Sequence, residues 1–474
     1  MSSLFAALNT VASSMDVLQQ AMGVVQNNVA NASTPGYATQ SLNIEARLFD
    51  PGSNLWGGVA SAGLNDSRNA SAEEAVWNQN ELLGTATQSA TSLSALQSIF
   101  NVTGTSGIPG ALSTLSAALS AWSSNPNDGP SRQQVLNAAQ GLAQAFNTTS
   151  STVGQLSTQT DQELQSTVTQ INALSSQIAQ INTGIRQGDQ NDPGLQAQLY
   201  NDLEQLSNLT SISAQTESDG TVTVTMAGQI PLVAGTTTTN LGVQFLPSSD
   251  ATNPDAPPDA HIITSTGQDV TSTVSNGQIA ALLHFRNVTL PSLTGDGEQQ
   301  GSLNQLAQSI ADQVNTLLTS GQTSSGAAGI PLFTYSPGSP TSVASTLALN
   351  PAITGSQLAA VDPGPPAVAN GVADQLTQLF STQISGLGNM TFTDFYSSLA
   401  AAIGNQESNA SATQQTQSQL LSQAQSARSQ LEGVSLNDQA ALLLQFQQSY
   451  EAASQMISVI NKTTQYLMTV MEQL

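Results

Sequence analysis

The residues that could perform chemistry in this sequence are few and far apart. His261 and His284 are the only two histidines, the chain has no cysteine, and neither histidine belongs to an HExxH zinc motif. The sequence also contains no GxxxxGK(S/T) phosphate loop and no GxSxG nucleophile turn. We therefore expect no enzyme activity, no catalytic residue, no cofactor and no bound metal. Both histidines are interpreted as surface or packing residues.

Calcium is the one ligand that the acidic residues suggest. Asp255 and Asp259 supply two carboxylates within a proline-rich loop. Their spacing does not match the ligand positions of an EF-hand loop, so we interpret this segment as a solvated loop.

The composition excludes several classes of partner. The 474 residues include 31 acidic and only 7 basic side chains, which gives a formal net charge of -24. The basic residues are scattered singly, so there is no basic patch for nucleic acid or for an anionic membrane. No apolar run approaches the roughly 18 residues of a membrane span, and residues 1–15 do not read as a signal peptide. These features indicate a cytoplasmic protein, or one exported without a cleaved signal.

The elements that must position a functional surface are two helices, one near each end of the chain. Apolar residues recur in both at alternating spacings of three and four, the heptad pattern of helices that pack through one narrow stripe. We expect these helices to pack on each other or on copies of themselves. The predicted assembly interface consists of Leu4, Leu8, Val11, Met15, Leu18, Met22, Val25, Val29, Leu443, Phe446, Tyr450, Ala453, Ile457, Ile460, Leu467 and Met471.

The surroundings of these stripes favour assembly over a free-standing coiled coil. The outer faces are polar but almost uncharged, and they lack the Glu and Lys pairs that flank such a seam. Helices without tertiary packing are marginal in water, so residues 1–40 and 436–474 are expected to be mobile in the monomer and ordered on assembly. The alternatives of another class are a cytoplasmic coiled-coil adaptor and an enzyme with an undetected site in the β-rich region.

The pattern along the chain predicts a mainly α fold with a β-rich insertion. The paired N- and C-terminal helices, which are coiled-coil-like, form an assembly domain, and a helical middle domain follows. An Asp219-Gly220 turn signal precedes a run that alternates with period two, which indicates strands. The predicted assembly domain comprises residues 1–45 and 434–474. The predicted middle domain comprises residues 46–210, 276–321 and 391–433. The β-rich region is expected over 211–275, and residues 322–390 are expected to form a Gly-, Ser- and Pro-rich insertion in an outer β-rich domain.

Individual helices are delimited by their breakers. We expect one helix over residues 3–30, ended by the turn at 31–36, and a helical stretch over 71–120. Two further helices are expected, one beginning at Ser131 and one over 160–187. A last helical stretch begins at Thr393, with predicted breaks near Gly404 and at Gly433.

Two segments carry a resemblance to a known family. Asn27-Asn28-Val29-Ala30-Asn31-Ala32-Ser33-Thr34-Pro35-Gly36-Tyr37 resembles the N-terminal signature of bacterial flagellar rod, hook and hook-associated proteins. The turn within it comprises Asn31, Thr34, Pro35, Gly36 and Tyr37. Near the other end, Phe446-Gln447-Gln448-Ser449-Tyr450 is similar to the partner signature of the hook-associated protein 1 family. Rod and hook proteins more often carry an Ala-Gln-Arg-x-Tyr version.

The resemblance implies a structural subunit of the hook–filament junction, secreted through the flagellar export channel. Its implied partners are the hook protein, the next hook-associated junction protein, a flagellar export chaperone and further copies in a helical ring. The implied chaperone contacts are Ile457, Ile460, Leu467 and Met471. A hook or rod subunit is the alternative within the class. Thr39 and the run Asn437-Asp438-Gln439 depart from the family pattern, and residues 322–390 match no part of it.

Overall fold

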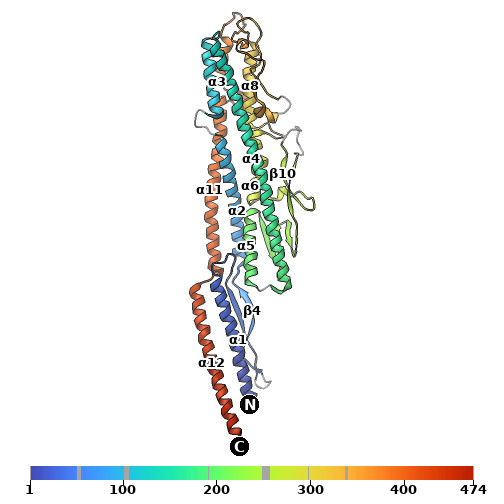
Figure 1. Cartoon of the computed structure of the whole chain (residues 1–474), viewed down its shortest axis with the longest axis vertical. Coiled ribbons are helices and arrows are strands. Elements are labelled where there is room, and N and C mark those ends of the chain that lie inside the picture. Colours follow the sequence, from blue (N-terminus) through green and yellow to red (C-terminus); the bar gives the residue numbers. More distant parts are fainter. Residues whose placement is uncertain are drawn as a thin grey trace. The chain divides into compact units, whose positions relative to one another are not determined.

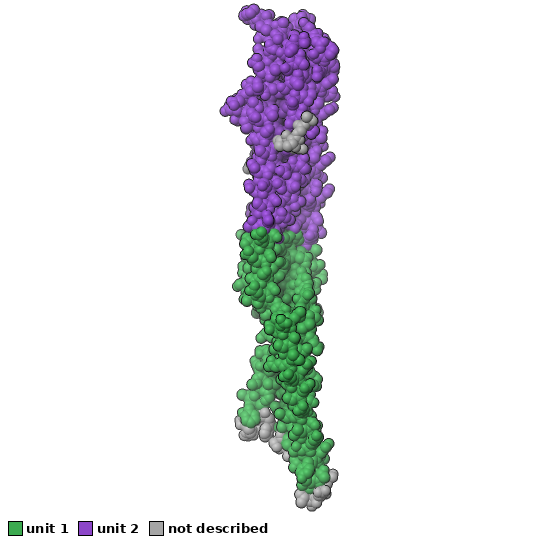
Figure 2. Space-filling model, turned by 90° about the vertical axis from the view of Figure 1, so that its left-hand side faces the viewer, with its two compact units in different colours: residues 1–81, 172–239, 418–474 green, residues 82–171, 240–417 purple. Residues whose placement is uncertain are grey.

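The computed structural model describes residues 2–50, 55–100, 106–189, 192–247, 257–296, 298–336 and 340–472. The chain forms two compact units, which Figure 2 colours separately. Unit 1 comprises residues 1–81, 172–239 and 418–474, and unit 2 comprises residues 82–171 and 240–417. Both units are built from segments that are distant in the sequence, because three long helices, α2 (Ala70–Ile99), α4 (Gly129–Gly184) and α11 (Phe392–Glu432), contribute residues to each.

Unit 1 contains the first and the last helix of the chain. Helix α1 (Ser2–Ala30) and helix α12 (Leu436–Glu472) lie side by side and antiparallel (Figure 1). Two hydrogen bonds fix this direction, because Gln19 binds Tyr450 whereas Asn28, further along α1, binds Gln439, earlier on α12. The predicted fold class, mainly α with paired terminal helices, is therefore confirmed.

A narrow β-arm packs beside α1 in the same unit (Figure 1). Strand β1 (Gln40–Ala46) pairs antiparallel with β4 (Val59–Asp66), and β2 (Phe49–Asp50) pairs with β3 (Leu55–Trp56). Gly58 has a φ of 103°, and a Cβ atom there would lie 2.9 Å from the Thr10 side chain of α1. Only glycine allows the arm to approach the helix this closely.

The rest of unit 1 combines helix ends with a small sheet. It holds the start of α2 (Ala70–Ile99), the end of α4 (Gly129–Gly184) with a π-helical turn (Ile185–Asp189), α5 (Pro193–Leu209) and the end of α11 (Phe392–Glu432). The Asp192 side chain accepts hydrogen bonds from the first amides of α5 and so caps it. The antiparallel sheet has the order β5 (Ile212–Thr216), β6 (Val222–Met226), β7 (Ile230–Ala234), β8 (Thr237–Thr238).

Unit 2 is a helical body with one main hydrophobic core. Trp122, Phe146, Phe333 and Phe392 are among its largest fully buried side chains. Its further helices are α3 (Gly107–Ser124), α6 (Gln278–His284), α7 (Pro291–Thr294), α8 (Ser302–Ser320), α9 (Val343–Thr346) and α10 (Gly371–Leu379). Its strands are β9 (Leu241–Leu246) paired with β10 (Asp259–Thr264), and β11 (Phe333–Thr334) paired with β12 (Ala348–Leu349).

The predicted insertion at 322–390 supplies part of this core. Leu332, Leu347, Leu358 and Leu376 are each buried against the helices of unit 2. The described part of the segment holds α9, α10 and short 3-10 turns, and its two strands, β11 and β12, have two residues each. The assignment of this segment to an outer domain, like the other predicted domain boundaries, stays a prediction.

Two expectations about helix boundaries were wrong. The expected break near Gly404 is absent, because α11 is continuous and its neighbours Ala400 and Ile403 are buried. A glycine inside a helix costs about 1 kcal/mol, which such packing exceeds. The two helices expected from Ser131 and over 160–187 are one, α4. The helical stretch expected over 71–120 comprises two helices, α2 and α3.

Candidate assembly interface

The predicted stripe on α12 is the side of that helix that faces α1. Leu443, Phe446, Tyr450, Ala453, Ile457 and Ile460 are each half-buried, whereas the residues between them are exposed. The Tyr450 hydroxyl accepts a hydrogen bond from the Gln19 side chain at 3.0 Å. Further along the helix, Leu467 is 40% exposed and Met471 is 62% exposed. The contact with α1 is therefore narrow and ends before the last turns of α12.

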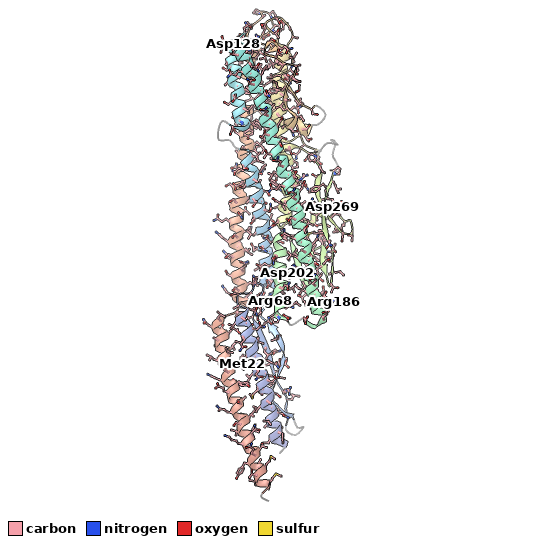
Figure 3. All side chains as sticks on the ribbon, in the orientation of Figure 1. Met22, Arg68, Asp128, Arg186, Asp202 and Asp269 are labelled. Carbon is pink, nitrogen blue, oxygen red and sulfur yellow. The ribbon has the colours of Figure 1, made fainter. Side chains whose placement is uncertain are left out.

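Helix α1 is covered from two sides, by α12 and by the β-arm. Its predicted stripe is half-buried at Leu4, Leu8, Val11, Met15, Leu18 and Met22, the last of which Figure 3 labels. Val25 is buried and Val29 is 46% exposed. Val17 and Ala21 are buried although they do not belong to the predicted stripe. The heptad pattern predicts one contact side of α1, whereas the arm provides a second.

A second apolar stripe lies on α12 beside the seam. We call Met456, Val459, Tyr466 and Val470 the outer face of α12, and their exposed fractions are 56, 61, 71 and 37%. At 3.6 residues per turn these four fall within about 80° of one another, to one side of the stripe that contains Ile457 and Ile460. Monomeric proteins rarely expose contiguous apolar surface of this kind unless another molecule covers it. This stripe is the strongest sign of an assembly surface in unit 1.

The buried side chain of Asn28 links the contact between α1 and α12 to the turn at residues 31–37. The Asn28 side chain donates to the backbone oxygen of Gln40 and to the side-chain oxygen of Gln439, at 2.8 and 2.9 Å. Its own oxygen accepts from the Tyr37 hydroxyl and from the Gln40 amide, at 2.8 and 2.9 Å. Asn28, Gln40 and Gln439 are all buried. Every hydrogen-bonding group of the Asn28 side chain is thus used, which fixes the register of α1, the turn, β1 and α12.

The turn itself has the shape that its sequence predicts. The Thr34 amide and hydroxyl donate to Asn31, and the Tyr37 amide donates to Thr34. Gly36 has a φ of 73°, and a Cβ atom there would lie 2.2 Å from the backbone oxygen of Ala197. Only glycine fits at this contact with α5. Pro35 is exposed at the surface.

Sequence reasoning missed Asn28 and Gln439 as functional residues. Gln439 lies four residues before Leu443 and therefore occupies a stripe position, where a polar residue commonly sets the register of two helices. That exception to the apolar pattern is the signal that could have identified it.

A buried cluster of charged residues lies at the base of the arm, and we call it the joint. The Arg68 guanidinium donates to Glu73 at 2.6 Å and lies 3.6 Å from the centre of the Tyr200 ring. Arg428, near the end of α11, bridges Glu73 at 2.9 Å and Glu204 at 2.8 Å. Figure 3 labels Arg68. These contacts hold α2, α5, α11 and the arm together.

The fifth member of the joint is Glu432, the last residue of α11. Its backbone oxygen accepts hydrogen bonds from the Thr39 amide, the Thr39 hydroxyl and the Ser67 hydroxyl, at 2.9, 3.0 and 3.1 Å. Its side chain accepts from the Asn69 amide at 2.8 Å. Burial, together with the nearby Glu73 carboxylate, raises the pKa of Glu432 to about 7. The end of α11, just before α12 begins, is thus fastened to both strands of the arm.

The described residues considered for chemistry lie on two elements of unit 2, with Asp259 and His261 on β10 and His284 at the end of α6. His261 contacts Asp269 at 2.7 Å, and His284 is exposed at the end of α6. Burial raises the pKa of Asp259, and Asp255 lies outside the described residues. Within the described ranges, no group of three His, Asp or Glu side chains is placed to hold a metal ion. No described helix is long and apolar enough to span a membrane.

Comparison with known proteins decides the family. The model of the flagellar hook-associated protein FlgK helical domain matches residues 93–333, which is just over half of the chain. The chain belongs to the flagellar hook-associated protein FlgK family. It is accordingly a structural component of the extracellular flagellum, at the hook–filament junction, and not an enzyme.

Individual relatives agree with this assignment. The chain is 25% identical to flagellar hook-associated protein 1 of Bacillus subtilis, over 97% of each sequence. It is 28% identical to the protein of the same name from Salmonella typhimurium, over 70% of this chain and 60% of that protein. The structure of the flagellar hook junction protein FlgK from Burkholderia pseudomallei has the same fold, with a TM-score of 0.62 at 19% identity, over 75% of this chain and all of that one.

Proposed function

We propose that this FlgK-family chain assembles through α1 and α12, with the outer face of α12 buried against neighbouring subunits. The observation that carries the proposal is the pair of apolar stripes on α12, one half-buried against α1 and the other exposed. An isolated subunit gains nothing from the second stripe. In a ring of copies, burying it contributes about 25 cal/mol for each square ångström removed from water.

The proposed neighbours are further copies in a helical ring, the hook protein and the next hook-associated junction protein. Contacts between different patches on successive copies generate such a ring or an open helix, whereas a self-complementary patch would give a closed dimer. The narrow seam with α1 supports this, because it leaves most of α12 available to other subunits.

An export chaperone is the proposed partner of α12 before assembly. Ile457 and Ile460 face α1, whereas Leu467 and Met471 are exposed beyond the seam. A helix with these residues on its surface is a suitable ligand for an apolar groove and an aggregation risk without one. The chaperone and α1 would then bind the same side of α12 at successive stages.

The assembly surface is tested by two pairs of substitutions on α12. Met456→Asp with Val459→Asp places charges on the outer face, and Ser454→Asp with Ser458→Asp adds the same charge to exposed positions off both stripes. We expect the first pair to abolish motility and hook-tip localisation of the labelled protein while secretion continues, and the second pair to have little effect. Normal filament growth with the first pair would contradict the proposal.

The chaperone is tested with Ile460→Asp and Leu467→Asp together. Burying an unpaired charge in the groove costs several kcal/mol, so chaperone binding and motility should both fall. The thermal transition of unit 2, which contains neither residue, should not change. Unchanged chaperone affinity would show that the chaperone binds elsewhere.

A further inference from the structure

A groove in unit 1 runs along the whole length of strand β5. Its volume is about 440 Å³, and all five residues of β5 line it. The opposite wall carries Glu74 and Trp77 of α2 with Tyr200 of α5. A second hollow of about 400 Å³ adjoins it, shares Tyr200 with it, and extends to the base of the arm at Gln40 and Asp66.

The groove exposes the unpaired edge of a β-sheet. Strand β5 is the end strand of its sheet and pairs only with β6. At the two ends of β5, the Ser211 oxygen accepts a hydrogen bond from the Ala227 amide and the Glu217 amide donates to Thr221. Because backbone groups alternate in direction along a strand, the odd-numbered residues of β5 point their N–H and C=O groups toward β6. The N–H and C=O groups of Ile212, Ala214 and Thr216 therefore point toward the groove. An edge of this kind is a template for an added strand.

Two further groups in the groove lack a partner within the described residues. Trp77 is 7% exposed and stacks on Tyr200, yet its indole N–H makes no hydrogen bond there. Such a buried donor normally has an acceptor. Glu74 is exposed at the wall and forms no ion pair in the described part of the chain. The groove thus offers a backbone edge, an aromatic wall and the exposed Glu74 carboxylate, with the unpaired but buried Trp77 N–H beneath the wall.

The end of the arm has the complementary groups. Leu48 and Phe49 are 79 and 70% exposed, among the most exposed large apolar side chains that the structure describes. Arg47 is exposed, and its guanidinium has no partner among the described residues. The Arg47 amide and the Leu48 oxygen bond to Gly58 and Gly57, whereas the Arg47 oxygen and the Leu48 amide form no backbone hydrogen bond within the described residues. We call Arg47, Leu48 and Phe49 the arm tip.

The arm tip cannot fill the groove of its own chain. The base of the arm, at Gln40 and Asp66, borders the second hollow that adjoins the groove, and the arm runs from there along α1, away from α5 (Figure 1). Strand β4 has 8 residues, which at about 3.3 Å per residue places the tip on the order of 20 Å from the base. The segment that fits the groove must come from another molecule.

We propose that the arm tip of a second copy of this chain docks in the groove along β5, with its free edge pairing with Ile212, Ala214 and Thr216. Leu48 and Phe49 then pack against Trp77 and Tyr200, and Arg47 pairs with Glu74. The two surfaces differ, so the contact is heterologous and propagates from copy to copy. The inference rests on the proposed assembly of copies and adds a second interface, separate from α12.

Disulfide cross-linking tests the contact directly, because the chain has no cysteine of its own. A chain with Leu48→Cys and Gln215→Cys, both exposed positions, is incorporated into flagella and mildly oxidised. We expect dimers and higher ladders of this chain in isolated flagella and none in dilute monomer. The control pairs Leu48→Cys with Thr237→Cys, which lies on β8 at the opposite edge of the same sheet, and should give no ladder.

Each other outcome overturns the proposal in a recognisable way. A cross-link within the dilute monomer would show that the arm tip reaches its own groove. A cross-linked product with a different flagellar protein would show that the occupant is not a second copy. If the chain is incorporated normally but no cross-linked ladder forms, the proposed contact of the arm tip is wrong and the proposed function of α12 is unaffected. If the chain is not incorporated into flagella at all, the proposed function itself is contradicted.

A charge exchange provides an independent test in chains that carry no cysteine. Arg47→Glu and Glu74→Arg each place like charges together at the contact. Because exposed ion pairs contribute up to about 1 kcal/mol, each single variant should lower filament retention about two- to fivefold. The double variant restores the opposite pairing and should recover most of the loss. A double variant as defective as the sum of its parents would refute the Arg47–Glu74 pairing.

Discussion

Asn28 links both terminal helices to the turn and to strand β1. Its side chain makes four hydrogen bonds to Tyr37, Gln40 and Gln439 in a buried setting. No periodic pattern distinguishes it from other asparagines in this Asn-rich chain. The turn residues after it could be predicted from the sequence, because Pro35 and Gly36 have strong local preferences.

The first prediction concerns this residue. Asn28→Ala leaves the Tyr37 hydroxyl, the Gln40 amide and the Gln439 side chain without their partner, at a cost of about 1–3 kcal/mol. We expect amides around residues 25–40 and 436–446 to exchange with solvent about tenfold faster. Hydrogen exchange by mass spectrometry measures this, with Asn9→Ala at an exposed position of α1 as the control. Equal exchange in both variants would contradict the role of Asn28.

The second prediction concerns Glu432, whose pKa is raised from its ordinary value of 4.5 to about 7. The folded state therefore binds a proton more tightly than the unfolded state, and stability falls as pH rises from about 4.5 to about 7. Burial also raises the pKa of Asp202, labelled in Figure 3, to about 6, so this residue likewise lowers the stability as the pH rises toward 6. Glu432→Gln keeps an acceptor for the Asn69 amide and removes the charge.

We expect Glu432→Gln to flatten the stability profile between about pH 4.5 and about pH 7 and to be the more stable form at and above the upper end of that range. Thermal unfolding at several pH values measures this, and Asp202→Asn should flatten only the more acidic part. Parallel profiles for the wild type and Glu432→Gln would show that the joint does not take up a proton in this range.

At the scale of elements, the stripe on α12 was visible in the sequence because its period of 3.5 is local. The joint was not, because Arg68, Glu204 and Arg428 meet only after folding and are separated by more than a hundred positions along the chain. Helix boundaries failed for a related reason. A lone glycine such as Gly404 breaks a helix only where packing does not compensate, and packing is a tertiary property.

The third prediction uses Gly404, inside α11, and Gly433, directly after its last residue, which were both expected to interrupt the helical stretch. Gly404 lies inside the helix, and a Cβ atom there would meet only the flexible end of Gln97, at 3.3 Å. Gly404→Ala should therefore stabilise the protein by up to about 1 kcal/mol. At Gly433 a Cβ atom would lie 2.4 Å from the backbone oxygen of Ser429, so Gly433→Ala should destabilise it. Thermal unfolding of both variants measures the difference, and a shift of the same sign in both would contradict this account.

At the scale of the whole molecule, the sequence was sufficient to predict the fold class and the family. Heptad stripes, period-two strands and turn signals depend on neighbours in the chain, and the family signatures are contiguous. The β-arm contact with α1, the groove along β5 and the joint depend on residues brought together from distant segments. Those features could be recognised only from the structure. The proposed assembly surfaces rest on local sequence patterns and on contacts between distant segments together.

The central claim is that neighbouring subunits cover the outer face of α12, and the accessibility of one introduced cysteine tests it most directly. Val459→Cys, in a chain that otherwise lacks cysteine, is treated with a maleimide reagent as purified monomer and again in isolated flagella. We predict rapid labelling of the monomer and at least about tenfold slower labelling in flagella, with Ser218→Cys in the exposed β5–β6 turn as a reference for accessibility. Equal labelling of Val459→Cys in the two states would contradict the account, because the outer face would then be as open in the assembled junction as in solution.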